Sequence, residues 1–190
     1  MKIGLYFGSF NPIHIGHLII ANHVINYTDM NQVWLVISPQ NPLKPSHTLL
    51  NEYHRLHLVQ KAIEDNSKLK ASDIEFRLSK PSYTIDTLIY LEEKYPNHKF
   101  SIVMGSDSFQ NINKWKKAED LKKNYSFIIY ERPGFELNKN IETKNIQILN
   151  APLLEVSATA IRNNIKKGKS IQYIVPDTVN KEIIENGYYK

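Results

Sequence analysis

Two histidines three positions apart follow a glycine turn near the start of the chain, in the segment Gly8-Ser9-Phe10-Asn11-Pro12-Ile13-His14-Ile15-Gly16-His17. Apolar spacing predicts a helix over residues 15–28, so His14 and His17 fall in its first turn. Residues three apart share a helix face, and each imidazole can donate a hydrogen bond to an anion. The amides and the positive dipole end of a helix start favour the same ligand. The pattern therefore indicates a site for nucleotide phosphates.

Other sites at a strand-to-helix turn need features that this segment lacks. It has no lysine at Walker spacing, so it is not a P-loop, and the dinucleotide pattern G-x-G-x-x-G is absent. A zinc site would need further ligands, and the chain contains no cysteine. The remaining alternatives are two ordinary surface histidines or half of a metal site.

A second candidate anion site lies late in the chain, in Glu155-Val156-Ser157-Ala158-Thr159-Ala160-Ile161-Arg162. Ser157 is expected to cap a helix over residues 157–167, and Thr159 and Arg162 lie three apart in its first turn. Arg162 can offer a fork of hydrogen bonds to the β- and γ-phosphates of a nucleotide. Alone, such a capped helix start is usually structural.

Taken together, these two segments resemble the H-x-G-H and S-x-T-x-x-R signatures of the nucleotidyltransferase superfamily, whose members transfer a nucleotidyl group from ATP or CTP to a phosphate. The resemblance implies direct in-line attack with no covalent enzyme intermediate. It implies catalytic roles for His14, His17 and Arg162. The residues it assigns to ATP here are Gly8, Ser9, Phe10, Ser157 and Thr159. Mg²⁺ is expected to arrive on the triphosphate, with no metal site in the protein itself.

The acceptor is indicated by Pro81-Ser82-Tyr83-Thr84-Ile85-Asp86-Thr87-Leu88, which resembles a signature of bacterial nicotinate-nucleotide adenylyltransferases. The resemblance places Tyr83 and Thr84 at the pyridine ring of nicotinate mononucleotide and makes Trp115 a stacking plate for that ring. Backbone amides near Trp115, including that of Lys116, would bind the pyridine carboxylate. The alternatives are a simple turn into a helix capped near Ser82 or Thr84, and a tryptophan packed on the core.

Further ATP contacts are implied at three places. Gly105 and Asp107, in Gly105-Ser106-Asp107-Ser108-Phe109, match the family's glycine and aspartate at the adenosine ribose, and Arg132, in Arg132-Pro133-Gly134, matches its R-P-G near adenine. Lys44 lies in the proline-rich segment 39–47, where it can swing over bound phosphates or simply be solvated. Arg55 is interpreted as a surface arginine on a helix and is left out of the site.

The elements that must position these residues follow an alternating pattern. Apolar runs predict strands at about 2–8, 32–38, 99–105, 125–131 and 146–149. Helical patterns occur at about 15–28, 52–65, 83–95, 115–123, 157–167 and 176–185. The alternation predicts a Rossmann-like α/β fold, with an open, mainly parallel sheet and helices on both faces. Gly8, Ser38, Gly105 and Arg132 would then share the carboxyl edge of that sheet.

Composition limits the remaining possibilities. With 190 residues and 42% apolar content, the chain is expected to form a single domain over 1–190, with the helices from about 157 packed on the same core. The absence of cysteine suits a cytoplasmic location, and no apolar run predicts a membrane span. The net charge of +5 suits an acidic ligand, but the lysines are too dispersed to favour nucleic acid. A homo-oligomer is allowed.

The resemblance therefore implies an enzyme that transfers the adenylyl group of ATP to nicotinate mononucleotide in NAD biosynthesis. Transfer to pantetheine phosphate is the nearest alternative, although that family commonly has threonine where this chain has His14. A polyol-phosphate cytidylyltransferase shares chiefly the first signature. A non-catalytic nucleotide sensor is the alternative from another class, and it would have no need of the reacting-phosphate donors His14, His17, Thr159 and Arg162.

Overall fold

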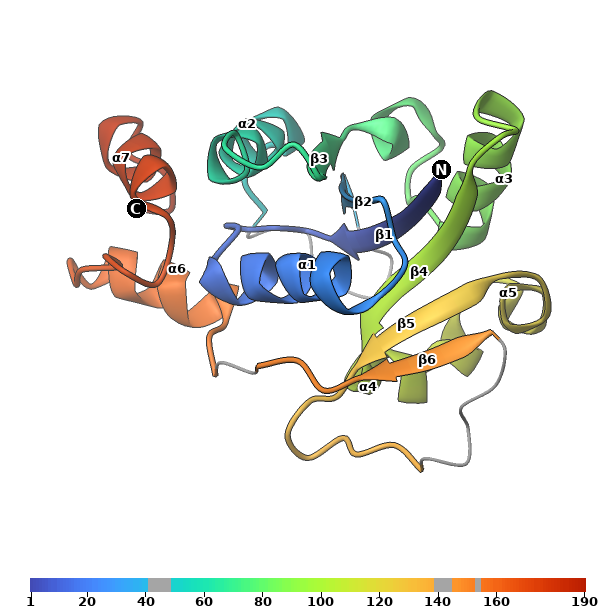
Figure 1. Cartoon of the computed structure of the whole chain (residues 1–190). Helices are drawn as coiled ribbons and strands as arrows, with labels where there is room; N and C mark the ends of the chain where they lie inside the picture. Colours follow the sequence, from blue (N-terminus) through green and yellow to red (C-terminus); the bar gives the residue numbers. More distant parts are fainter. Residues whose placement is uncertain (41–48, 139–144, 153–154) are drawn as a thin grey trace.

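The computed structural model describes residues 1–40, 49–138, 145–152 and 155–190. Lys44 and residues 41–47 of the proline-rich segment lie outside the described residues. A six-stranded parallel sheet has the order β3-β2-β1-β4-β5-β6 (Figure 1), which confirms the predicted Rossmann-like fold. The strands are β1 (Lys2–Gly8), β2 (Gln32–Ile37), β3 (Leu69–Ser72), β4 (Lys99–Gly105), β5 (Ser126–Tyr130) and β6 (Ile146–Leu149).

Helices cover both faces of the sheet, as predicted. The α-helices are α1 (Ile15–Tyr27), α2 (Glu52–Ala62), α3 (Thr84–Lys94), α4 (Ser106–Gln110), α5 (Ala118–Asn124), α6 (Ala158–Lys166) and α7 (Asp177–Glu185), and the short 3₁₀ helices are η1 (Ile74–Arg77) and η2 (Ile112–Lys114). One apolar cluster joins α1, α2, α6 and α7 to one face of the sheet, and a second joins α3, η2 and α5 to the other. Successive strand side chains point to opposite faces, so each central strand serves both clusters.

β1 shows why these runs form a parallel sheet. It pairs with β2 on one side and with β4 on the other, so its ladder groups are bonded along both edges. Its residues Ile3 and Leu5 enter one cluster, while Tyr6 enters the other. A strand covered on both faces needs apolar residues at consecutive positions rather than strict alternation. This is the pattern from which the sequence predicted it.

The structure differs from the prediction in added elements and in the bounds of two helices. β3 and α4 were not predicted, and the helix expected over 52–65 ends at residue 62. The helix expected over 115–123 begins at Ala118, because Lys117 adopts a left-handed backbone conformation (φ 53°). Trp115 and Lys116 therefore lie in a short turn between η2 and α5 rather than on a helix.

The two last helices, α6 and α7, lie together at one end of the molecule, toward which β1 points (Figure 1). α7 ends in a Schellman motif, in which the amide of Gly187 (φ 63°) bonds to Ile184 and that of Tyr188 bonds to Ile183. The predicted cap at Gly187 is confirmed. Among the helices of the described residues, none is both long and apolar enough to cross a membrane.

Candidate active site

The turn after β1 is shaped by Phe10, which has a positive φ of 44° and a side chain only 2% exposed. Its ring covers Gly8, where a Cβ would lie only 2.8 Å from the nearest ring atom. Glycine is therefore required at position 8 by packing within the protein, in addition to the close backbone approach to phosphate that the sequence suggested. The side chain of Asn11 accepts from the amide of Leu50 at 3.1 Å, which ties the turn to the chain before α2.

His14 and His17 are stacked on one another at the start of α1. Their ring centroids are 3.7 Å apart with an interplanar angle of 24°, and His14 is the N-cap residue. The backbone amide of His14 donates to Nδ1 of His17 at 3.3 Å. Because Nδ1 accepts, a neutral His17 carries its proton on Nε2. Nε2 is then the atom of His17 that can donate to a phosphate oxygen.

His14 lies deeper than His17 and is only 6% exposed. Burial, reinforced by the positive charge of Arg132, lowers the pKa of His14 to about 4. At neutral pH its imidazole is therefore uncharged. Its Nδ1 is buried and has no hydrogen-bond partner within the described part of the chain. This nitrogen is oriented toward the backbone amide of His17, in a capping-box arrangement at the start of α1.

The start of α6, which carries the second signature, lies against the turn that carries the first. Nη1 of Arg162 donates to the carbonyl oxygen of Asn11 at 2.7 Å, and Nη2 donates to Oγ1 of Thr159 at 3.3 Å. Ser157 caps α6 as predicted, since its hydroxyl accepts from the amide of Ala160 at 3.1 Å. The start of α6 and the turn before α1 therefore face the same space, and the helix dipoles of both favour an anion there.

The residues predicted at the adenosine lie together at the ends of β4 and β5. Nε of Arg132 is 3.5 Å from Oδ1 of Asp107, and the backbone amide of Arg132 donates to Oγ of Ser106 at 2.8 Å. A Cβ at Gly105 would lie 2.5 Å from Oδ1 of Asp107. Glycine at 105 thus leaves room for the carboxylate beside the strand end.

Two tyrosines join this edge to the histidines. The hydroxyls of Tyr6 and Tyr130 are 3.1 Å apart, and Nη2 of Arg132 donates to the Tyr130 hydroxyl at 3.4 Å. The Tyr6 ring packs edge-on against His17, with centroids 6.1 Å apart. Burial, together with Tyr130, raises the pKa of Tyr6 well above its ordinary value, so its hydroxyl stays protonated. Sequence analysis missed both tyrosines, because an aromatic residue within an apolar strand is normally core.

The predicted acceptor residues lie around the start of α3. The ammonium of Lys116 is 4.8 Å from the ring centroid of Tyr83 and 2.8 Å from Oδ2 of Asp86. Tyr83 and Trp115 both pack against the same apolar cluster. The N-cap of α3 is Tyr83, with no side-chain cap, so neither Ser82 nor Thr84 caps this helix. Asp86, which sequence analysis did not single out, offsets the charge of Lys116.

Arg55 is not the surface arginine that the sequence suggested. It is 0% exposed, and it bonds four carbonyl oxygens from three segments of the chain. Nη1 donates to Ser9 at 2.6 Å and to Ser38 at 2.8 Å, Nε donates to Leu50 at 2.8 Å, and Nη2 donates to Pro39 at 3.1 Å. Four carbonyls replace the water that the guanidinium loses on burial. Arg55 therefore holds the phosphate turn against the end of β2.

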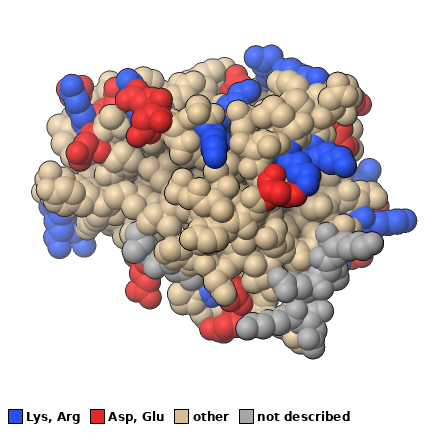
Figure 2. All heavy atoms as spheres, in the orientation of Figure 1, with Lys and Arg blue, Asp and Glu red and all other residues tan. Residues whose placement is uncertain are grey.

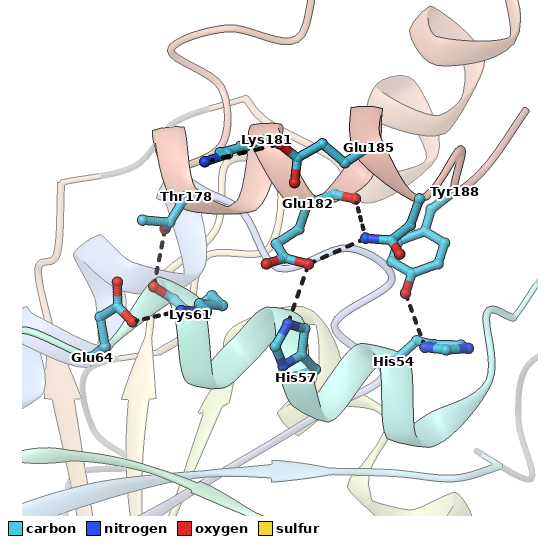
Figure 3. A network of polar contacts seen from close by, with 10 residues as sticks. His54, His57, Lys61, Glu64, Thr178, Lys181, Glu182, Glu185 and Tyr188 are labelled. Carbon is cyan, nitrogen blue, oxygen red and sulfur yellow. Dashed lines mark hydrogen bonds and ion pairs between the residues drawn. The ribbon is translucent and has the colours of Figure 1, made fainter.

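α2, which carries Arg55, is held in turn by α7 (Figure 3). Nε2 of His57 lies 3.2 Å from Oε2 of Glu182, and the Tyr188 hydroxyl lies 2.9 Å from Nδ1 of His54. The Thr178 hydroxyl donates to the carbonyl oxygen of Lys61 at 3.0 Å. These contacts run along α2 on both sides of Arg55, so α7 supports the helix that anchors the phosphate turn.

The described residues contain no group of three or more His, Asp or Glu side chains placed to hold a metal ion. Basic side chains are spread over the face seen in Figure 2, and several lie beside acidic ones. The local donors to an anion are instead those gathered at the carboxyl edge of the sheet. The predicted site residues found together there are Gly8, Ser9, Phe10, His14, His17, Gly105, Asp107, Arg132, Ser157, Thr159 and Arg162.

Comparison with known proteins gives a consistent result. The cytidylyltransferase-like family matches residues 5–164. A protein of Flavobacterium johnsoniae named "Probable nicotinate-nucleotide adenylyltransferase" is 49% identical over 193 residues, covering 100% of both chains. One of Flavobacterium psychrophilum with the same name is 50% identical over 192 residues, again with 100% coverage of both.

Solved structures agree with these relatives. The nicotinic acid mononucleotide adenylyltransferase of Plasmodium falciparum, complexed with NaAD, superposes with a TM-score of 0.85 at 26% identity, covering 99% of this chain and 97% of that one. The same enzyme complexed with APC gives a TM-score of 0.84, with 99% and 96% covered. The similarity therefore extends over the entire sheet and the helices on both of its faces.

Proposed function

The chain belongs to the cytidylyltransferase-like family, and from this we infer that its site performs nucleotidyl transfer. It transfers the adenylyl group of ATP to nicotinate mononucleotide and releases pyrophosphate, giving deamido-NAD in NAD biosynthesis. The observation that carries this conclusion is full-length identity of 49% and 50% to relatives named for that activity. The fold neighbour complexed with NaAD supports the same acceptor.

We propose that the phosphate of nicotinate mononucleotide attacks the α-phosphorus of ATP in line with the leaving pyrophosphate. The attacking oxygen is already ionised, so the reaction needs alignment and charge stabilisation more than a general base. His17, through Nε2, and His14 donate to oxygens whose negative charge grows in the transition state. Neutral His14 still has one N–H to donate, because the low pKa caused by its burial removes only the second proton.

Arg162 complements the histidines from the other side of the phosphates. A guanidinium has five N–H donors, and the bonds to Asn11 and Thr159 use two of them. We propose that others contact the β- and γ-phosphates, with Ser157, Thr159, Ser9 and the amides of the turn. Lys44 is proposed to cover the same phosphates. Gly105, Asp107 and Arg132 are proposed to hold the adenosine.

Mg²⁺ fits this arrangement as a companion of ATP. The ion is proposed to arrive bound to triphosphate oxygens and water, as Mg²⁺ commonly is. The chemistry it supplies is neutralisation of the charge on the leaving pyrophosphate. The protein's own donors then act on the remaining oxygens.

The acceptor is proposed to bind at the start of α3. Trp115 would stack on the pyridinium ring, with Tyr83 and Thr84 beside it. The side-chain charge of Lys116 is offset by Asp86, 2.8 Å away. Recognition of the pyridine carboxylate is therefore assigned to backbone amides near Lys116, and we expect preference for the acid over the amide. Equal kcat/KM for nicotinate and nicotinamide mononucleotides would overturn this assignment.

ATP and nicotinate mononucleotide are the proposed partners, and no nucleic acid or membrane partner is expected. A cytoplasmic location, organisation of residues 1–190 as one domain and a possible homo-oligomer stay predictions from the sequence.

The decisive experiment measures pyrophosphate release with ATP and Mg²⁺ against nicotinate mononucleotide, nicotinamide mononucleotide and phosphopantetheine in parallel. We expect strong turnover with nicotinate mononucleotide alone. Turnover with phosphopantetheine instead would retain the phosphate site and contradict the roles of Thr84 and Trp115. No turnover with any acceptor, combined with nucleotide binding, would indicate a sensor.

A further inference from the structure

A buried carboxylate lies behind the proposed acceptor site. Glu75, in η1, is only 2% exposed, although it carries an ionisable group. Its Oε2 accepts from the hydroxyl of Ser82 at 2.6 Å, and its Oε1 accepts from the hydroxyl of Thr87 at 3.0 Å. Ser82 and Thr87 are themselves buried, at 7% and 0% exposure. The sequence patterns singled out neither Glu75 nor Thr87.

Such a group is costly to bury, so its placement calls for a reason. Burial raises the pKa of Glu75, while hydrogen bonds from Ser82, Ser38 and Thr87 act in the opposite direction. Buried charges are tolerated when several hydrogen bonds replace the lost water, and an apolar side chain of similar size is often at least as stabilising. Stability alone therefore does not account for a glutamate here.

What Glu75 holds is the segment proposed to bind the acceptor. Ser82 immediately precedes Tyr83, and Thr87 also donates to the carbonyl oxygen of Tyr83 at 3.2 Å. The N-cap residue of α3, Tyr83, makes no side-chain capping bond. The start of α3 is therefore held by the carboxylate of Glu75 in η1, which bonds one residue on each side of Tyr83 and Thr84.

The same carboxylate also lies next to the phosphate turn. Ser38, which helps to lower the pKa of Glu75, follows β2, and its carbonyl oxygen accepts from Nη1 of Arg55. The same Nη1 bonds the carbonyl oxygen of Ser9. Ser38 thus lies between Arg55, which bonds the phosphate turn, and Glu75, which bonds the start of α3. Networks of this kind transmit position because each member is fixed by the next.

We propose that Glu75 is a positioning residue for the acceptor, which sets where Tyr83 and Thr84 lie relative to the reacting phosphates. The proposal rests on the proposed function, since it assumes that nicotinate mononucleotide binds at α3. It predicts a selective effect: loss of Glu75 weakens acceptor binding far more than ATP binding, because the ATP residues are held by other contacts.

The test is steady-state kinetics of Glu75→Gln with both substrates varied. Glutamine keeps the shape but replaces one accepting oxygen with a donor, so it can no longer accept from both hydroxyls. We expect KM for nicotinate mononucleotide to rise about tenfold or more, as for loss of a hydrogen bond to a charged group, with KM for ATP changed less than about twofold. Ser82→Ala and Thr87→Val should each reproduce part of the increase.

Glu64→Gln is the matched control, because Glu64 is exposed and, among the described residues, its ion pair is with surface Lys61, at 3.2 Å. It should leave both KM values unchanged. If the Glu75→Gln variant does not fold, Ser82→Ala and Thr87→Val carry the same test, since each removes a single hydroxyl. Equal rises in both KM values, or unchanged KM for the acceptor, would overturn the proposal.

The two hypotheses fail in different ways. A wild-type enzyme that shows no turnover with nicotinate mononucleotide contradicts the proposed function. A wild-type enzyme that turns it over, alongside Glu75, Ser82 and Thr87 variants with normal KM for the acceptor, contradicts only the role assigned to Glu75.

Discussion

Arg162 and Asn11 are 151 positions apart in the chain, yet the guanidinium of one donates to the backbone carbonyl of the other at 2.7 Å. This contact brings the helix start that carries Ser157 and Thr159 to the turn that carries His14 and His17. Neither signature forms an anion site of this size alone. Their meeting is the structural basis for assigning both to one triphosphate.

Replacement of Arg162 tests this directly. Arg162→Ala should lower kcat by about 10²- to 10³-fold, the usual cost of losing a donor to transition-state charge. Arg162→Lys should recover only part of the loss, because an ammonium lacks the planar fork of donors. Single-turnover kinetics measure the effect, with Lys166→Ala as a control on the same helix. Full activity of Arg162→Ala would contradict the assignment.

His17 is predicted to act through Nε2. His17→Ala should reduce kcat by about 10²- to 10³-fold with a smaller change in KM for ATP, since the bond strengthens in the transition state. His17→Gln places an amide donor near the same point and should retain more activity. The control is His23→Ala, which alters the same helix six residues further along. A kcat of His17→Ala equal to that of the wild type would exclude a catalytic role.

Replacement of Gly16 is predicted to change catalysis without changing stability. A Cβ at this position would lie 3.1 Å from Nδ1 of His14, so the ring must shift by a few tenths of an ångström. Alanine favours helix by about 1 kcal/mol over glycine, which offsets the crowding. Gly16→Ala should therefore keep its thermal stability while kcat falls by about three- to tenfold through misplacement of the imidazole. A clear loss of thermal stability alongside the loss of kcat would contradict this explanation.

The buried His14 makes stability depend on pH. Its pKa is about 4 in the folded protein and about 6.5 when unfolded, so between these values the unfolded chain binds more protons. The contribution of His14 to the free energy of unfolding is about 3 kcal/mol. It is fully present above pH 6.5 and is lost as the pH falls toward 4. Urea unfolding at several pH values should show a shallower dependence for His14→Gln than for wild type. Binding of a non-hydrolysable ATP analogue should raise the pKa of His14, because a bound phosphate favours the charged ring. NMR titration of His14 with and without the analogue measures this shift.

Arg55 is predicted to be essential for folding stability. Arg55→Met keeps much of the bulk but leaves four buried or partly buried carbonyls without the Arg55 donor, which should cost about 3–5 kcal/mol. Chemical unfolding measures the loss. Arg77→Met is the matched control, because Arg77 is exposed and should change stability by less than about 0.5 kcal/mol.

The sheet could be predicted from the sequence because β1, β2, β4 and β5 are apolar at consecutive positions, as strands buried on both faces must be. β3 was missed because it is a short edge strand that contains Lys70, and its apolar signal is weak. The helix over 115–123 was predicted to start too early, because composition does not reveal the left-handed conformation of Lys117.

The site shows a similar division. His14, His17 and Arg162 could be predicted because each signature is local, within one turn of helix. Arg55 and Glu75 could not, because their burial depends on partners from several segments that only the fold brings together. A charged residue on a polar helix has the same pattern whether solvent or four carbonyls surround it.

The central position of β1 in the sheet also affects how the protein folds. β1 pairs with β4, in register from Lys2 opposite Lys99, and the turn after β1 contacts Arg162 from far along the chain. Contacts of such long sequence separation form slowly, because a large loop has to close before they stabilise the chain. We therefore expect the nucleotide site to be completed late in folding, so that binding of an ATP analogue would report that the chain has reached its native state.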